Sequence, residues 1–359
     1  MRTAQQNPRE QSSSRFAWVD IAKGICIVAV VCLYTFHQLE NMGLDPGWLS
    51  SWSAFARPFR MPDFFLISGL FLSRVIDRPW RQYLDTKVLH YFYFIVLWSI
   101  FIFLWNWGGQ LSEMGAYKSA KLFAYVIYRP EAMLWFIQTL AFYFVVTRLL
   151  RRAPAMLMLL AGLLLRVSEY RTGIYPIDWF GEFYFFFLCG VFFAKHWFAI
   201  ADWAVQHRRL SWSALIAWVV FNEWMVESTA IGNAWVLVGV GMVGITAVIM
   251  FSSLINDQRW AYVFRYLGKN SIVVYLGFYL PLLWMSKAYV QSQITINHHL
   301  LGALLVILGI AAAVALFVVT RSSPLRFLFE RPAWARLSTH KASPRSSAAA
   351  PAAHGEASS

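Results

Sequence analysis

The sequence has 359 residues, of which 59% are hydrophobic, 18% aromatic and only 14% charged. This composition excludes a soluble protein and predicts a polytopic membrane protein of the all-α class, built as a transmembrane helical bundle. The formal net charge of +13 does not indicate nucleic-acid binding, because the basic residues lie between apolar segments and form no basic domain.

About ten segments are apolar and long enough, with some tilt, to cross a hydrocarbon layer of roughly 30 Å. Spans five and seven have the shortest apolar cores, and the stretch 119–128 is too short to count as a span. The predicted spans cover approximately residues 19–39, 55–74, 88–107, 132–149, 153–170, 177–197, 211–226, 232–255, 271–290 and 300–320.

The distribution of basic residues predicts the orientation of the spans. Lysine and arginine gather in the N-terminal stretch and in every second connection, whereas the opposite connections 223–231 and 291–299 contain none. Cytoplasmic connections carry the excess of basic residues in membrane proteins. Both termini are therefore predicted to be cytoplasmic, and the protein is expected in the cytoplasmic (inner) membrane.

The chain divides into three parts. Residues 1–15 are polar and lead straight into the first span, so they predict a cytoplasmic tail without a removable signal peptide. Residues 16–320 form the transmembrane domain. Residues 321–359 begin basic and end in Ser, Ala and Pro, which predicts a largely disordered cytoplasmic tail.

The first span carries polar side chains where lipid disfavours them: Asp20, Lys23, Tyr34 and His37. A helix advances about 100° per residue, so Lys23, Tyr34 and His37 share one face. A rise of about 1.5 Å per residue separates Lys23 from His37 by roughly 21 Å, which places one near each membrane surface. Ionisable groups in a span indicate a buried site or pathway.

Later spans contain further candidates. The second span begins Arg60-Met-Pro-Asp63 and continues to Ser68, Trp135 lies in the fourth, and Glu182 lies among aromatic residues in the sixth. A carboxylate in an apolar helix needs a partner or stays protonated. No pair of cysteines has metal-ligand spacing, and the adjacent His298 and His299 cannot chelate as an i,i+4 pair would, so neither a metal site nor a disulfide framework is expected.

Four motifs in this order resemble the acyltransferase-3 family of integral-membrane O-acyltransferases. The resemblance covers roughly residues 15–320, and its most specific part is the first two spans together. The motifs are Asp20-x-x-Lys23-Gly24 leading to His37, Arg60-Met-Pro62-x-Phe64-Phe65-x-x-Ser68-Gly69, Leu134-Trp135-Phe136, and Leu267-Gly268-Lys269-Asn270-Ser271 with Tyr275.

The resemblance implies a membrane enzyme that moves an acyl group, commonly acetyl from acetyl-CoA, onto hydroxyls of carbohydrate-containing acceptors. The expected partners are an acyl-CoA donor, a carbohydrate or glycolipid acceptor and the lipid bilayer. Acyl-CoA is a co-substrate, and no permanently bound cofactor is expected.

Two positions depart from the family pattern. The family typically has Arg, ten residues and His in the first span, whereas this chain has Lys23 and Tyr34, with His37 one turn further on. Phe278 stands where the family often has a second His. The lysine places the chain nearer to the sugar O-acetylase-like branch.

The residue types fit acyl transfer. His37 is the expected general base for the acceptor hydroxyl, and Arg60, Tyr34 and Ser68 are candidate donors to the oxyanion of the thioester carbonyl. Lys23, with Arg74 and Arg78 from the following connection, is expected to bind the phosphates of coenzyme A. The expected supporting residues are Asp20 at i−3 to Lys23, Asp63, Ser68, Trp135 and Glu182.

Three other interpretations stay open on the sequence alone. The charged first helix could line the route of a transporter or flippase for an envelope precursor, without acyl transfer. The exchanges at Tyr34 and Phe278 fit a relative that has lost its activity. Lys23 and Arg60 could also extend to the membrane surface as simple anchors.

Overall fold

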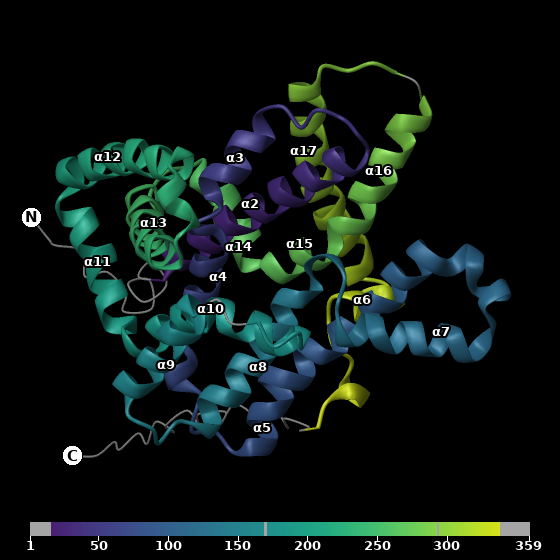
Figure 1. Ribbon diagram of the computed structural model, residues 1–359, viewed down its shortest axis with the longest axis horizontal. Helices are drawn as coiled ribbons and strands as arrows, with labels where there is room; N and C mark the ends of the chain where they lie inside the picture. The colour runs from purple at the N-terminus through teal and green to yellow at the C-terminus, as the bar shows by residue number, and fades with distance from the viewer. Residues whose placement is uncertain (1–15, 169–170, 293, 338–359) are drawn as a thin grey trace, which may run out of the picture.

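The computed structural model describes residues 16–168, 171–292 and 294–337, which form helices and no strands (Figure 1). A π-helical turn at Asp85–Leu89 joins α5 to α6. The α-helices in chain order are α2 (Ala17–Asn41), α3 (Trp48–Ala56), α4 (Arg60–Gly69), α5 (Trp80–Leu84), α6 (His90–Trp107), α7 (Leu111–Tyr128), α8 (Trp135–Leu149), α9 (Ala155–Val167), α10 (Tyr175–Phe192), α11 (Ala194–Gln206), α12 (Arg208–Glu227), α13 (Ala234–Leu254), α14 (Ala261–Lys269), α15 (Ser271–Gly277), α16 (Tyr279–Ser292) and α17 (His298–Arg321).

An all-α membrane bundle is confirmed. Within the described ranges, six helical segments are long and apolar enough to cross a membrane, and α10 with α11, bent by 75°, makes a seventh if counted as one span. These segments account for seven of the predicted spans. The other three, at 55–74, 153–170 and 211–226, do not meet the same criteria of length and apolar composition. The thirteen residues of α9, for example, cover only about 20 Å.

The predicted second span, 55–74, is broken in the structure. The helix α3 ends at Ala56, a turn follows, and α4 starts at Arg60 and has ten residues. Ten residues rise about 15 Å, roughly half of a hydrocarbon layer. The first turn of α4 lies in the interior of the protein, and Arg60 is only 6% exposed.

Small residues of α13 hold the turn between α3 and α4. A Cβ atom added to Gly241 would lie 2.8 Å from the carbonyl oxygen of Pro58, and one added to Gly244 would lie 2.6 Å from Cβ of Phe59. Gly241 and Gly244 therefore allow the close packing that small residues provide between membrane helices.

The helix α4 crosses α10 at two glycines. A Cβ on Gly69 would meet the carbonyl of Phe187, and a Cβ on Gly190 would meet the carbonyl of Leu66. Beside this crossing, the buried ring of Phe65 packs among aromatic rings of α8 and α10. Backbone contact on one side and ring packing on the other fix the position of α4.

The helix α2 passes through the middle of the bundle, where it packs against α3, α4, α13, α14 and α17 (Figure 1). Its crossing with α14 is the most extensive, because Gly24 faces the carbonyl of Phe264 and Gly268 faces the carbonyl of Asp20. The Gly268 motif near the ninth span therefore shapes the packing around the lysine end of α2.

Connections predicted on the same side of the membrane contact one another. On the predicted outer side, the backbone N–H of Trp48 donates to Nδ1 of His299 over 3.2 Å. On the predicted cytoplasmic side, Arg151 pairs with Asp77 over 3.4 Å. These contacts agree with an alternating path of the chain.

Part of the predicted C-terminal tail is packed. Arg331 forms an ion pair with Asp85 over 2.7 Å, and the Asp85 carboxylate also accepts from the backbone N–H of Leu337. The indole of Trp98 donates to the carbonyl of Leu328. The packed domain therefore extends beyond residue 320 to at least 337, because a buried aspartate selects a partner from this segment. Residues 1–15 and 338–359 of the predicted tails lie outside the described residues.

Replacing Gly190 with alanine should destabilise the protein by about 1–3 kcal/mol, because the new Cβ collides with backbone of α4 that cannot move aside. The thermal midpoint in detergent should fall by about 5 °C. Gly239→Ala is the matched control, since nothing lies within 4 Å of its Cβ position. Equal midpoints for both variants would contradict the close crossing of α4 and α10.

Candidate functional site

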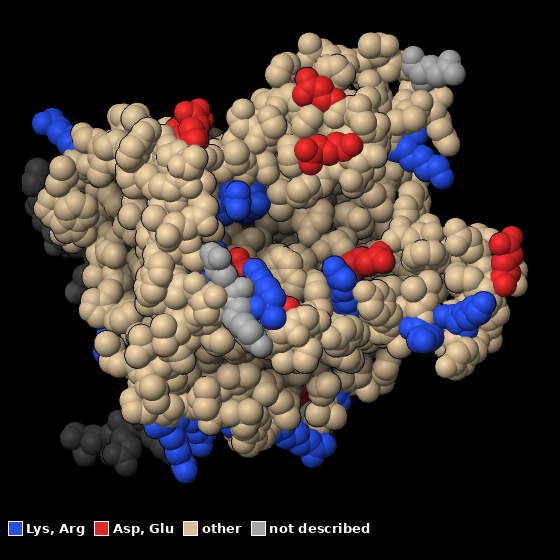
Figure 2. All heavy atoms as spheres, viewed as in Figure 1, with Lys and Arg blue, Asp and Glu red and all other residues tan. Residues whose placement is uncertain are grey.

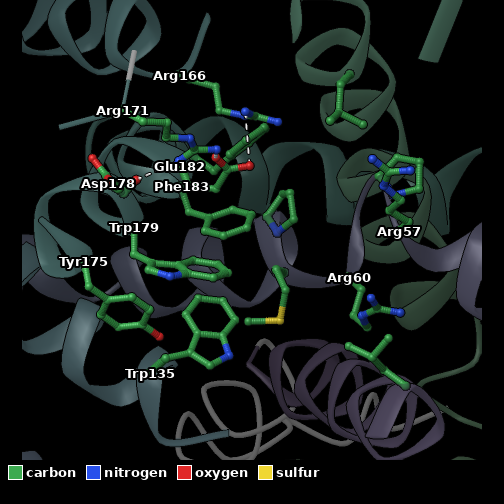
Figure 3. A pocket seen from close by; sticks show the side chains of 16 residues that line it. Arg57, Arg60, Trp135, Arg166, Arg171, Tyr175, Asp178, Trp179, Glu182 and Phe183 are labelled. Carbon is green, nitrogen blue, oxygen red and sulfur yellow. Dashed lines mark hydrogen bonds and ion pairs between the residues drawn. The ribbon is translucent and has the colours of Figure 1, made fainter. Parts of the chain in front are cut away.

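A cavity of about 500 Å³ lies where α4 begins. Its walls come from α2, the turn that precedes α4, and the helices α8, α9, α10 and α13. Figure 2 shows a hollow near the middle of the viewed face with basic and acidic side chains around it. Figure 3 shows that aromatic side chains line one part of the cavity and arginines another.

Aromatic side chains of α8 and α10 form one wall. The rings of Trp135 and Trp179 have centroids 4.3 Å apart, and Phe183 lies 5.9 Å from Trp135 (Figure 3). Tyr175 stands at the start of α10, where Arg129 lies over its ring at 5.2 Å. The wall therefore presents broad, rigid apolar faces to the cavity.

Ion pairs form a second part of the lining, next to the aromatic side chains of α10. The Glu182 carboxylate accepts from Arg166 and from Arg171, each over 3.1 Å (Figure 3). Asp178 accepts from the backbone N–H of Thr172 over 2.7 Å and so holds the connection before α10 beside the cavity. The predicted carboxylate at position 182 has the partner that an apolar helix demands.

Arg60 is buried at the first position of α4, and its side chain lines the cavity. Its Nε and Nη1 groups have no hydrogen-bond partner. Leaving buried donors of a charged group unsatisfied costs several kcal/mol. Such a group at the wall of a cavity is suited to bind an anionic atom of a ligand.

Asp63 lies one turn after Arg60 and is completely buried. Its Oδ2 accepts from the Sγ–H of Cys26 over 2.6 Å, whereas its Oδ1 has no partner. No ion pair within 4.0 Å joins Asp63 to Arg60 among the described residues. The structure therefore gives Asp63 a thiol partner from α2 that the sequence did not indicate.

Tyr34 and Phe278, the two positions that depart from the family pattern, contact each other. Their ring centroids lie 5.6 Å apart, and the ring of Tyr279 lies 5.8 Å from that of Tyr34 and 6.2 Å from that of Phe278. The side chain of Trp135, which lines the cavity, lies beside the Tyr34 hydroxyl. The residues that stand at the two family histidine positions thus form one aromatic cluster behind the cavity wall.

His37 lies outside the cavity lining, and its side chain is 53% exposed. Its Nδ1 lies 3.4 Å from Oε2 of Glu40 on the next turn. Leu33, which does line the cavity, precedes His37 by four residues. Residues at i and i+4 share a helix face, so His37 stands about 6 Å beyond Leu33 along that face.

The predicted donor-binding residues lie near the other end of α2. Lys23 and Arg78 both act electrostatically on Lys87, which places the three cations in one neighbourhood. Arg74 lies over the rings of Phe16 and Phe71, at 5.2 and 5.4 Å.

Two supporting residues, Asp20 and Ser68, do not make the contacts that the sequence predicted. Asp20 acts electrostatically on Lys23, but no ion pair within 4.0 Å joins the two among the described residues. The Ser68 hydroxyl donates to the carbonyl of Phe64 over 2.8 Å. Ser68 follows Arg60 by eight residues, about 12 Å along the helix, so the two cannot donate to one oxyanion.

The structure therefore brings Arg60, Trp135 and Glu182 to one cavity and places Tyr34 behind its wall. The predicted site lacked a group of lining residues from the turn before α4, from α9 and from α10. Opposite charges on both sides of the connection between the fifth and sixth predicted spans could have signalled part of it. The missed residues are Arg57, Arg166, Arg171, Tyr175, Asp178, Trp179 and Phe183.

A sequence model described as an acyltransferase domain matches residues 16–321. The chain belongs to the acyltransferase-3 family. This confirms the resemblance of its motifs, and the match covers all the described helices from α2 to α17. No group of three or more potential metal ligands occurs among the residues that the structure describes.

A curated relative is the inner membrane protein YcfT of Escherichia coli (strain K12), which is 26% identical over 186 residues. The match covers 46% of this chain and only 51% of the relative, about half its length. No solved structure matches this chain.

Replacing Glu182 with glutamine should destabilise the protein by about 2 kcal/mol, because Arg166, only 9% exposed, would lose its carboxylate partner. Thermal unfolding in detergent measures this change. Glu113→Gln removes an exposed carboxylate of α7 that has no ion-pair partner among the described residues. If both variants unfold at the same temperature as the parent, the Arg166–Glu182 pair does not stabilise the cavity wall.

Proposed function

We propose that this protein transfers an acyl group, acetyl in the simplest case, from acyl-CoA to a hydroxyl of an envelope carbohydrate or glycolipid. The observation that carries the proposal is Arg60, a buried arginine with two unpartnered nitrogens at the wall of a cavity. The chain's membership in the acyltransferase-3 family supplies the reaction class.

Arg60 would stabilise the transition state. Attack of a hydroxyl on a thioester carbonyl places negative charge on the carbonyl oxygen. A guanidinium that is already fixed, buried and free of other partners can donate to this oxyanion without reorganising. The N-terminus of α4 adds the favourable end of the helix dipole at the same place.

His37 would act as the general base, assisted by Glu40. If the Glu40 carboxylate accepts from Nδ1–H, the lone pair of Nε2 is free to take the proton of the acceptor hydroxyl. The hydroxyl oxygen then forms the new ester bond, the C–S bond breaks, and the thiolate of coenzyme A leaves and takes up a proton. Glu40, which lies on the next helical turn after His37, was not part of the predicted site.

The two substrates would approach from opposite ends of α2. Lys23, Arg78 and Lys87 form a cationic neighbourhood suited to the phosphates of coenzyme A, with Arg74 near the same end. The acceptor would lie in the cavity, where the flat apolar faces of a sugar ring can stack on Trp135 and Trp179. This arrangement fits a cytoplasmic donor, an acceptor outside, and a protein in the inner membrane with both termini cytoplasmic.

The broken helix α3–α4 also favours a second candidate function. Discontinuous helices with charged groups at membrane depth are typical of transporters. In that case the cavity would bind an envelope precursor and no ester would form. Dependence on acyl-CoA separates the two functions.

Arg60→Ala should reduce acyl incorporation at least a hundredfold, because removing one oxyanion donor typically costs that much in turnover. The measurement is transfer of labelled acetyl from acetyl-CoA to envelope carbohydrate, with equal amounts of inserted protein. Arg60→Lys keeps the charge but not the fork of donors, and should retain intermediate activity. Full activity in Arg60→Ala would remove Arg60 from the mechanism.

His37→Ala should lower turnover at least a hundredfold without changing the KM for acyl-CoA, since a general base contributes that much to the chemical step. Glu40→Gln should have a smaller effect, about tenfold, because it alters only the orientation of the ring. A parent-like turnover in His37→Ala would show that another group takes the proton.

A further inference from the structure

The positively charged side chains that line the cavity outnumber the negatively charged ones. Among the described residues, four arginines line it, namely Arg57, Arg60, Arg166 and Arg171, against the two carboxylates of Asp178 and Glu182. Glu182 pairs with both Arg166 and Arg171, which come from α9 and from the connection before α10. The uncompensated positive charge therefore lies at the other wall, with Arg57 and Arg60.

Arg57 and Arg60 flank the start of α4 and have no carboxylate within 4.0 Å in the part of the chain described. Arg60 is buried with Nε and Nη1 unpartnered, whereas Arg57 is exposed. In Figure 3 both side chains lie across the cavity from the aromatic wall. In the proposed reaction Arg60 meets a negative charge only in the transition state, and Arg57 has no assigned role.

The backbone adds to this positive region. The N–H groups of a helix's first turn have no partners within the helix and favour an anion at its end. The helix α4 has ten residues, and Met61 and Pro62 of its first turn line the cavity with Arg60. Pro62 has no N–H, so the amides that the first turn can offer to an anion are those of Arg60 and Met61.

We infer that the acceptor carries a fixed anionic group, a phosphate or a carboxylate, which Arg57 and the N-terminus of α4 bind while the sugar ring lies on the Trp135–Trp179 wall. The inference rests on the proposed function, in which the ligand of this cavity is the acyl acceptor, and it adds the chemical class of that acceptor. A neutral sugar would use the aromatic wall and leave Arg57 without a counter-charge. An anionic sugar can stack its ring on the tryptophans and place its charge beside Arg57 at the same time.

The same arrangement explains the position of the ion-paired wall. Glu182 neutralises Arg166 and Arg171, so the attraction for an anion is confined to the side of the cavity that holds Arg57 and Arg60. An acceptor would therefore bind in one orientation, with its charge toward α4 and its ring toward α8 and α10. A fixed orientation is what places one hydroxyl next to the reacting carbonyl.

Binding of three probes to the purified full-length protein in nanodiscs tests the inference. Glucose, glucose 1-phosphate and glucuronic acid share the ring and differ in charge, and the fluorescence of the tryptophans in the wall reports binding. We expect at least one charged sugar to bind ten times or more tightly than glucose, and the tighter of the two identifies the group. Equal affinity for glucose and both charged sugars would overturn the inference.

Two variants locate the effect. Arg57→Gln should lose at least tenfold in affinity for the charged sugar and leave glucose binding unchanged. Lys118→Gln removes an exposed cation of α7 that does not line the cavity, and should behave as the parent. A charge preference that survives in Arg57→Gln, or that disappears in Lys118→Gln, would contradict binding at Arg57.

Acetyl-CoA hydrolysis by the parent in the same nanodiscs keeps the two proposals apart. The sugar-binding experiment alone decides whether the cavity selects an anionic sugar. Hydrolysis that persists when charged and neutral sugars bind equally would leave acyl transfer in place and remove only the acceptor class. Selective binding of a charged sugar without turnover of either acetyl-CoA or succinyl-CoA would instead overturn the proposed function.

Discussion

The structure depends on a helix that begins inside the protein. The ten residues of α4 cannot cross a bilayer, so the helix starts at a buried turn and presents Arg60 there. A buried arginine with free donors is costly, and the surrounding packing maintains it. Gly241 and Gly244 of α13 hold the turn, and the glycine crossing with α10 holds the helix. The same contacts that fix α4 therefore create the cavity and its positive wall.

Much of the fold could be predicted from the sequence, since apolar length and charge placement directly reflect the bilayer. Seven of the spans reappear as long apolar helices or as the bent α10–α11 pair. The second span was predicted as continuous, and its break was missed. Apolar composition does not reveal that residues 57–59 leave the helix to pack on α13. Nor does it reveal that Asp85 selects Arg331 from 246 residues away.

The site was predictable where a motif or an isolated charge identified a residue. Arg60, Trp135 and Glu182 line the cavity and belong to the predicted set. Arg60 and Glu182 were identified because a charged side chain in an apolar segment needs polar surroundings, and Trp135 was identified by its motif. Arg57, Arg171 and Trp179 lie near predicted span ends, where charged and aromatic residues are common, so their positions gave no distinct signal. Tyr34 and Phe278 show a different limit, since only the structure reveals that these two exchanged positions contact each other.

The most direct test of acyl transfer is binding and hydrolysis of acetyl-CoA and succinyl-CoA by the purified protein in nanodiscs, compared with Lys23→Ala and His37→Ala. The account predicts saturable binding of one thioester that Lys23→Ala weakens, and slow hydrolysis that His37→Ala abolishes without weakening binding. Failure of the parent to bind either thioester would contradict acyl transfer and favour transport.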